Sequence, residues 1–207
     1  MPVSQTLPPR ENPLGTEKIT TLIRKFSVPA IISMIVNAVY NMVDQIFIGQ
    51  KIGMLGIAAT NVALPLTAVC GAAALLLGVG GASNFNLKLG AGKSDEASYI
   101  AGNTLSALAV AGCSIAALVL VFYQPLLQLF GVTNSVLPYA VPYVLITAPG
   151  FPFLIFATGA CNLIRADGAP NYSMGCMLAG AVFNLIFDPI FLFVFNMGIE
   201  GIALATT

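Results

Sequence analysis

The sequence contains no histidine, and only 8% of its 207 residues are charged. Without histidine, the chain lacks the side chain that most often transfers protons near neutral pH and most often binds metals. Soluble domains carry about 25% charged residues, so this composition excludes an ordinary soluble protein. Eight basic and eight acidic residues give a net charge of zero, which argues against a polybasic surface for nucleic acid.

Cysteine is also scarce. The four cysteines, Cys70, Cys113, Cys161 and Cys176, lie in apolar stretches without CxxC spacing. This pattern argues against disulfides and metal sites, and it predicts four small buried residues. What the chain has in abundance is apolar side chains: 57% of the residues are hydrophobic and the mean hydropathy is +0.91, which indicates an integral membrane protein. The first apolar stretch is too long for a signal-peptide core, so we expect no cleaved leader.

The apolar stretches predict five membrane-spanning helices and the start of a sixth, because about 20 apolar residues cross the hydrocarbon core. The predicted fold is an all-α polytopic transmembrane helix bundle. We expect residues 1–25 to be a cytoplasmic polar leader, and residues 26–207 to be a transmembrane lobe that stops within helix six of a longer protein. The predicted spans are 26–49, 56–87, 99–122, 137–164 and 174–195, with the sixth starting at residue 201.

Two features of the third and fourth spans concern local structure. The stretch 123–136 has no charge and is predicted to be a loop. Prolines disrupt regular helices, so the fourth span is expected to be irregular or kinked. The prolines are Pro138, Pro142, Pro149 and Pro152.

The basic residues predict the orientation in the membrane. With a cytoplasmic amino terminus, seven of the eight basic residues lie on the inner side, and Lys51 alone lies on the outer side. Cytoplasmic loops carry an excess of Lys and Arg, so this distribution favours a cytoplasmic amino terminus. The seven inner residues are Arg10, Lys18, Arg24, Lys25, Lys88, Lys93 and Arg165.

Two aspartates lie inside the predicted spans, Asp44 in the first and Asp188 in the fifth. An aspartate at membrane depth costs roughly 2.5–3.5 kcal/mol on insertion scales, so it is expected only in a protein interior or a wet cavity. With a rise of about 1.5 Å per residue, Asp44, Asp188 and Thr206 all lie roughly 8–11 Å below the outer surface. Oxygen atoms from three helices at one level predict a shared site for a proton or a sodium ion. The sequence does not separate these two cations.

Residues near the aspartates extend this candidate site. Asn184 shares a helix face with Asp188, and Tyr40 precedes Asp44 by one turn and is placed to donate a hydrogen bond to it. Two carboxylates in a medium of low dielectric constant disfavour a second negative charge, so one of them can retain a proton near neutral pH. Pro189 cannot donate a backbone hydrogen bond, which predicts a hinge in the fifth helix. The structural alternative is a pair of buried aspartates satisfied by neighbouring amides.

Three asparagines within the spans, Asn37, Asn41 and Asn162, are candidates for lining the same cavity. Interhelical hydrogen bonds made by asparagine are a common structural alternative in membrane bundles.

Several stretches resemble the amino-terminal lobe of the multidrug and toxic compound extrusion (MATE) transporters. The most specific is NLIFDPIFLFVFNMGIEGIALAT at 184–206, and the weaker ones include 29–49 and RADG at 165–168. The resemblance implies an antiporter of the plasma membrane, which is the inner membrane in bacteria. In such an antiporter, cation binding in this lobe drives the efflux of organic, often cationic, compounds from a cavity between two six-helix lobes. It also implies a cation site formed by Asp44, Tyr40, Asn184, Asp188 and Thr206.

The sequence is also compatible with other functions. A lipid-linked saccharide flippase of the same wider superfamily would usually need basic residues in its cavity, and the interiors of these spans contain none. A membrane enzyme such as a phospholipid head-group transferase would need clustered acids near the cytoplasmic surface, so we expect no enzyme. A non-functional truncated product is a further alternative. The expected partners are a small organic substrate, the lipid bilayer and a carboxy-terminal lobe, and no cofactor is expected besides the coupling proton or sodium ion.

Overall fold

The computed structural model describes residues 18–206, and every regular element in that range is a helix, which confirms the predicted all-α fold. Most of the predicted leader, residues 1–17, lies outside the described residues. The first described helix begins at Ile19, before the predicted start of the first span at residue 26. The helices are α2 (Ile19–Lys51), α3 (Met54–Gly90), α4 (Ser94–Leu129), α5 (Leu137–Thr147), the 3-10 helix η1 (Ala148–Gly150), α6 (Phe151–Ala166), α7 (Pro170–Pro189), the π-helix η2 (Ile190–Val194) and α8 (Ile199–Thr206).

Within residues 18–206, five helical segments are long and apolar enough to cross a membrane, in agreement with the five predicted spans. The fourth segment, Leu137–Ala166, consists of α5, η1 and α6, so its predicted irregular course is confirmed. Pro149 lies inside the 3-10 turn. A proline cannot donate to the carbonyl four residues earlier, which explains why the regular helix is interrupted there.

The prediction of a loop over residues 123–136 is wrong for its first half. The helix α4 breaks at Phe122 (φ −112°, ψ 21°) and then continues to Leu129. Pro125 accounts for both observations, because its ring is excluded from a helix interior but suits the first turn of a new helical segment. Leu127 is fully buried in the core, so this uncharged stretch supplies helix packing.

Three helices, α3, α4 and α6, end in the same way. Each is followed by a glycine with positive φ, and the residue after that glycine donates its backbone N–H to the carbonyl five residues earlier. This is the Schellman arrangement, which favours glycine because other residues are strained at positive φ. The glycines are Gly92, Gly131 and Gly168.

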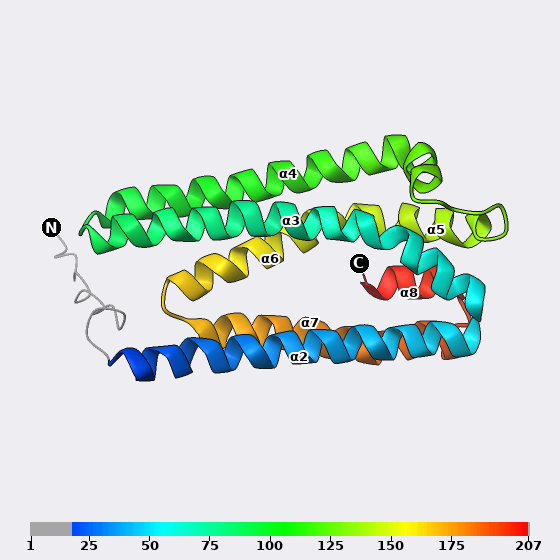
Figure 1. Cartoon of the computed structure of the whole chain (residues 1–207), viewed down its shortest axis with the longest axis horizontal. Helices are drawn as coiled ribbons and strands as arrows, with labels where there is room; N and C mark the ends of the chain where they lie inside the picture. The colour runs from blue at the N-terminus through cyan, green and yellow to red at the C-terminus, as the bar shows by residue number, and fades with distance from the viewer. Residues whose placement is uncertain (1–17, 207) are drawn as a thin grey trace, which may run out of the picture.

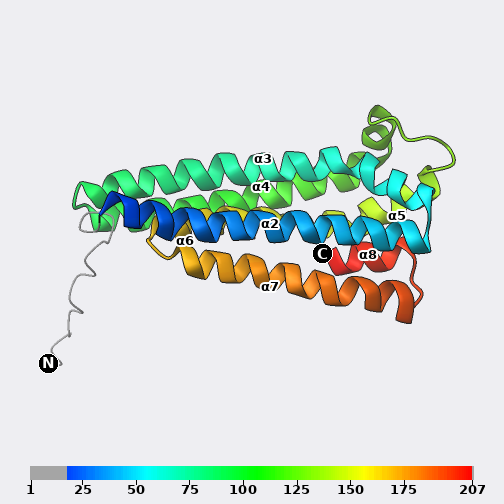
Figure 2. The ribbon, with the colours of Figure 1, turned by 60° about the horizontal axis from the view of Figure 1, so that its bottom comes forward.

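The helices form two packed groups, which Figures 1 and 2 show from two sides. In one group α3, α4 and α6 pack against one another, and in the other α2 pairs with α7. The short helix α8 contacts both α5 and α7 and lies between the groups. Within the first group the backbones are very close, since a Cβ atom on Gly78 would lie 2.7 Å from the Cα atom of Gly159. Small residues at such crossings are typical of membrane helices.

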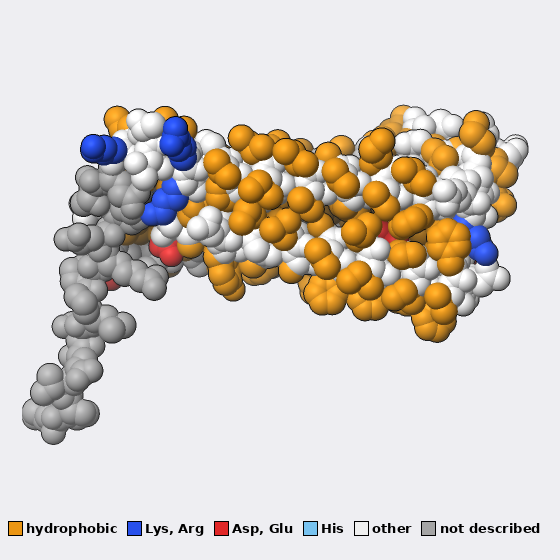
Figure 3. Space-filling view, turned by 90° about the horizontal axis from the view of Figure 1, so that it is seen from below, with side chains coloured by type: hydrophobic (Ala, Val, Ile, Leu, Met, Phe, Trp, Pro, Cys, Tyr) orange, Lys and Arg blue, Asp and Glu red, His pale blue; other side chains and the backbone are white. Residues whose placement is uncertain are grey.

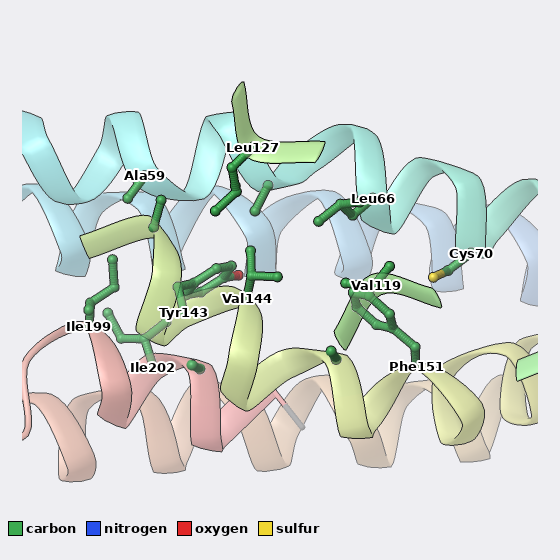
Figure 4. Close-up of a cluster of buried hydrophobic side chains, with 14 of the residues drawn as sticks. Ala59, Leu66, Cys70, Val119, Leu127, Tyr143, Val144, Phe151, Ile199 and Ile202 are labelled. Atoms are coloured by element: carbon green, nitrogen blue, oxygen red, sulfur yellow. The ribbon is translucent and has the colours of Figure 1, made fainter. Parts of the chain in front are cut away.

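The surface carries a broad apolar band, with Lys and Arg side chains towards the two ends of the bundle (Figure 3). This pattern is expected for a protein surrounded by lipid. Inside the molecule, the main apolar core is formed by α3, α4, α5, α6 and α8, and Figure 4 shows Leu66, Val144 and Ile202 within it.

The prediction that all four cysteines are buried is only half right. Cys70 and Cys161 are buried, whereas Cys113 and Cys176 are exposed, and all four are free thiols. An apolar segment of a membrane protein faces lipid as readily as it faces the core, so apolar neighbours in the sequence do not determine burial.

Candidate cation site

Asp44 on α2 and Asp188 on α7 are both buried, with exposed fractions of 8% and 2%. Their helices pack against each other, and the two carboxylates are close enough to interact electrostatically. The phenol of Tyr40, one turn before Asp44, interacts electrostatically with both of them. The structure therefore brings together three side chains that the sequence selected from two distant segments.

Each aspartate has one carboxylate oxygen without a partner. Oδ1 of Asp44 and Oδ1 of Asp188 are buried, and neither accepts a hydrogen bond from the described part of the chain. The hydrogen bond predicted from Tyr40 is therefore not formed at Oδ1 of Asp44. A buried acceptor without a donor costs about 1–3 kcal/mol, so the pair is an unsatisfied site into which a proton or a cation would fit.

Asn184 and Thr206 are carried by helices that contact each other. Asn184 is half-buried on α7, and its side chain makes no hydrogen bond within residues 18–206. Thr206 is exposed on α8 and donates its hydroxyl to the carbonyl of Ile202 at 2.9 Å. Because that bond uses only the hydroxyl hydrogen, the oxygen of Thr206 can still act as a cation ligand.

The three asparagines suggested as cavity-lining residues lie in two different environments. Asn37 and Asn41 are exposed on α2, and the amide of Asn41 donates to the main-chain and side-chain oxygens of Asn37 at 2.7 and 3.1 Å. Asn162 is half-buried on α6 and donates to the carbonyl of Thr158 at 3.1 Å. Its Nδ2 would lie 3.2 Å from a Cβ on Gly78, which places it at the contact between α3 and α6. The cavity-lining role of all three residues stays a prediction.

Tyr143 on α5 belongs to the same group, although the sequence did not single it out. It is 9% exposed and interacts electrostatically with Asp44, Tyr40 and Asp188. Tyr143 lies six residues after the start of α5, which corresponds to about 9 Å of depth. The depth estimate that selected the aspartates would have found this tyrosine if it had been applied to the fourth span.

Gln45 links the same end of α2 to α3. Its amide lies within hydrogen-bond distance of the Thr60 hydroxyl, with Nε2 and Oε1 at 3.3 and 3.4 Å from Oγ1. Thr60 is buried and also donates to the carbonyl of Ile57 at 3.0 Å. Since Gln45 follows Asp44 directly, this contact fixes the position of the first carboxylate relative to α3.

Pro189 lies at the last position of α7 and is followed directly by the π-helix η2. Its ring nitrogen carries no hydrogen, so the carbonyl of Leu185 loses its usual helical donor. The N–H of Ile190 bonds to the carbonyl of Phe187, and the N–H of Phe195 bonds to the carbonyl of Ile190. Short π-helical segments occur frequently at functional sites. This irregularity next to Asp188 is compatible with the predicted hinge, which stays a prediction.

The possible ligands at this site are all oxygen atoms. They come from two carboxylates, one carboxamide, two phenols and one hydroxyl. Within residues 18–206, no three His, Cys, Asp or Glu side chains are grouped as a transition-metal site would require. Oxygen ligands of this kind suit a proton or a sodium ion.

Similar proteins were found by sequence and by structure. The family model named MatE matches residues 29–190. The multidrug export protein MepA of Staphylococcus aureus is 28% identical over 181 residues, which is 87% of this chain and 40% of that protein. MepA of Staphylococcus haemolyticus is 30% identical over the same shares of both chains. The chain therefore spans about two fifths of the length of these curated relatives.

Solved structures of MATE transporters have the same fold. The MATE multidrug transporter DinF-BH has a TM-score of 0.87 and 38% identity, covering 93% of this chain and 43% of the transporter. A MATE in its straight conformation has a TM-score of 0.88 and 27% identity, covering 95% of this chain and 44% of that one. With the family model matching most of its length, the chain belongs to the MatE family, the MATE transporters, and corresponds to their amino-terminal lobe.

Proposed function

We propose that this chain is the cation-binding half of an antiporter that exports organic, often cationic, compounds in exchange for protons or sodium ions. The observation that carries the proposal is the buried pair Asp44 and Asp188, whose carboxylates interact while each keeps one unpartnered oxygen. Ionisable groups inside a membrane protein are expensive and mark ion pathways. The names of the relatives, a multidrug export protein and a multidrug transporter, support the substrate class.

In the proposed mechanism, Asp44 and Asp188 hold the coupling cation between α2 and α7. Tyr40, Asn184 and Thr206 contribute further oxygen ligands or adjust the affinity. Loss of the cation leaves two like charges in a medium of low dielectric constant, which favours a conformation that admits water. Bending at Pro189 would allow α7 to respond to this change in charge.

The same proposal assigns a wall of the substrate cavity to the exposed amides of α2. Asn37 and Asn41 lie on a helix that crosses the membrane, where polar side chains are expected to face water or protein. Asn162 would contribute from α6. A second lobe would form the opposite wall, because alternating access moves one helix bundle against another around the site.

We further propose a plasma-membrane location with the start of α2 in the cytoplasm. The start of α2 and the α3–α4 and α6–α7 turns lie at one end of the bundle (Figure 1). Six of the described basic residues belong to this end, and an excess of Lys and Arg favours the cytoplasmic side. They are Lys18, Arg24, Lys25, Lys88, Lys93 and Arg165.

The test uses a full-length transporter that contains this lobe, in cells loaded with a fluorescent cationic dye. Asp188→Asn should abolish efflux driven by a proton or sodium gradient and leave the amount of protein in the membrane unchanged. Asp167→Asn is the matched control, since Asp167 is exposed in the α6–α7 turn. Imposing each gradient separately identifies the coupling ion. Undiminished efflux by Asp188→Asn would refute the assignment.

A further inference from the structure

Two adjoining hollows follow the surface between α3 and α4, at the end of the bundle where these helices are joined. One has a volume of about 480 Å³ and is lined by Lys88, Asp95, Glu96, Tyr99 and Ile100. The other has a volume of about 320 Å³, and its lining includes Leu76, Leu77, Gly80, Asn84, Ile100 and Asn103. Ile100 lines both hollows, so they adjoin each other, and the two together are here named the α3–α4 groove.

The lining of the α3–α4 groove changes from charged to polar to apolar with distance from the turn. Asp95 lies at the charged mouth, and Asn103, eight residues further along α4, lies about 12 Å deeper. Leu76 and Leu77 lie deeper again along α3. A phospholipid has the same order of chemistry, with a charged head group, then glycerol esters, then an acyl chain.

Polar groups in the groove have unused hydrogen-bonding capacity. Asp95 and Asn103 have no hydrogen-bond or ion-pair partner among residues 18–206. Asn84 uses one of its two N–H groups to donate to the carbonyl of Gly80 at 3.1 Å. Lipid tails cannot satisfy such groups, whereas ester carbonyls accept hydrogen bonds from carboxamides.

The charges at the mouth indicate the class of head group. The Glu96 carboxylate forms ion pairs with Lys88 at 2.6 Å and with Lys93 at 2.8 Å. Each ammonium has three N–H groups, so both lysines can still donate to a further acceptor. Lys88, Asp95 and Glu96 line the mouth, and Lys93 lies beside it through its ion pair with Glu96, so these four residues carry two positive and two negative charges, which cancel. Separated charges that sum to zero fit a zwitterionic head group, whose phosphate would contact the lysines and whose cationic group would contact Asp95. A primary ammonium suits Asp95 better than a trimethylammonium group, because only the former donates hydrogen bonds.

We propose that the α3–α4 groove binds one phospholipid with a phosphoethanolamine head group, with the ammonium at Asp95, the esters at Asn84 and Asn103, and an acyl chain along Leu76 and Leu77. The inference is independent of the cation site. The floor of the groove offers a specific test, since a Cβ on Gly80 would meet no atom within 4 Å. A larger side chain at this position would fill the groove without a clash in the protein.

The experiment is native mass spectrometry of the delipidated chain, titrated with dioleoyl phosphatidylethanolamine, phosphatidylcholine or phosphatidylglycerol. One phosphatidylethanolamine should bind about tenfold more tightly than either other lipid. Asp95→Asn should remove most of this preference, Asn103→Leu should weaken binding about fivefold, and Gly80→Leu should abolish the single-lipid complex. Asn86→Leu and Asp167→Asn change exposed residues outside the groove lining and should bind like the unmodified chain.

Equal affinity for the three lipids would overturn the proposal, as would groove variants that behave like the controls. The same spectra report dimers. If the groove variants disrupt a dimer while leaving lipid binding unchanged, the groove is a protein interface and the lipid assignment is wrong. Asp95→Asn alters only an exposed side chain, so the test remains decisive even if Gly80→Leu fails to fold.

Discussion

Replacing Asp188 with leucine should make the chain more stable in the absence of a coupling cation. Asp188 is 2% exposed, and its Oδ1 has no partner in the described part of the chain. A buried polar atom without a partner costs about 1–3 kcal/mol, and a leucine at this position removes that cost. We expect Asp188→Leu to raise the free energy of unfolding by about 1–3 kcal/mol. For a chain of this length, each kcal/mol raises the unfolding midpoint by about 2–4 °C.

With a coupling cation bound, the unmodified chain should instead be more stable than Asp188→Leu. A ligand that binds only the folded state at 100 times its dissociation constant stabilises it by about 2.7 kcal/mol. If Asp188 is a ligand, the unmodified chain should gain about 5–10 °C in its unfolding midpoint at saturation, and Asp188→Leu should gain little. If the coupling ion is a proton, acidification should stabilise the unmodified chain more than Asp188→Leu, because the unmodified chain has two buried carboxylates to protonate and the variant keeps only Asp44.

The assay is thermal unfolding of the purified chain in detergent, followed by circular dichroism. One series replaces choline with sodium at constant ionic strength, and the other lowers the pH at constant sodium. Asp167→Asn, which changes an exposed carboxylate, should match the unmodified chain in both series. The reasoning is refuted if Asp188→Leu is less stable than the unmodified chain in choline at high pH, or if it keeps the full response to both sodium and acid.

Three further predictions concern packing and the role of the lobe. Gly78→Ala should lower stability by about 1–3 kcal/mol in the same melts, because its Cβ would lie 2.7 Å from the Cα of Gly159, whereas Gly71→Ala, with no atom within 4 Å, should not destabilise the chain. Ser173→Ala should lower the free energy of unfolding by about 1–3 kcal/mol, because the buried Ser173 hydroxyl donates to the carbonyl of Cys161 and accepts from Arg165 Nε, both at 3.1 Å. The unfolding midpoint of this variant tests the prediction. Cells that express only residues 1–207 should export a cationic dye no faster than cells with an empty vector, and faster export would overturn the need for a second lobe.

The helical class and the number of spans were predictable because they depend on local sequence. A run of apolar residues must be long enough to cross the membrane wherever the other helices lie, so five spans follow from length and hydropathy. Relative depth also follows from counting residues along a helix, which is why Asp44 and Asp188 could be paired. These properties require no knowledge of helix packing.

What the sequence did not predict depends on which face a helix turns towards its neighbours. Counting residues gives the depth of Tyr143, but the direction of its side chain follows from the course of α5 before the 3-10 turn, and apolar neighbours cannot reveal that direction. Cys113 and Cys161 lie in equally apolar surroundings, yet only Cys161 faces protein. The uncharged stretch 123–136 was predicted to be a loop, but a helical segment resumes there because Leu127 packs into the core.

The distribution of close contacts indicates which helices could move if the proposed site binds a cation. In the α3–α4–α6 group, Cβ atoms on Gly78 and Gly112 would lie 2.7 Å from the Cα atoms of Gly159 and Pro152, so sliding these helices would bring side chains into backbone. Tightly packed interfaces resist gradual deformation. The α7 helix instead carries the unpartnered Asp188, and it loses a backbone hydrogen bond at Pro189 before a π-helix. A change in the charge of the carboxylate pair should therefore move α7 and α8 relative to a fixed α3–α4–α6 group.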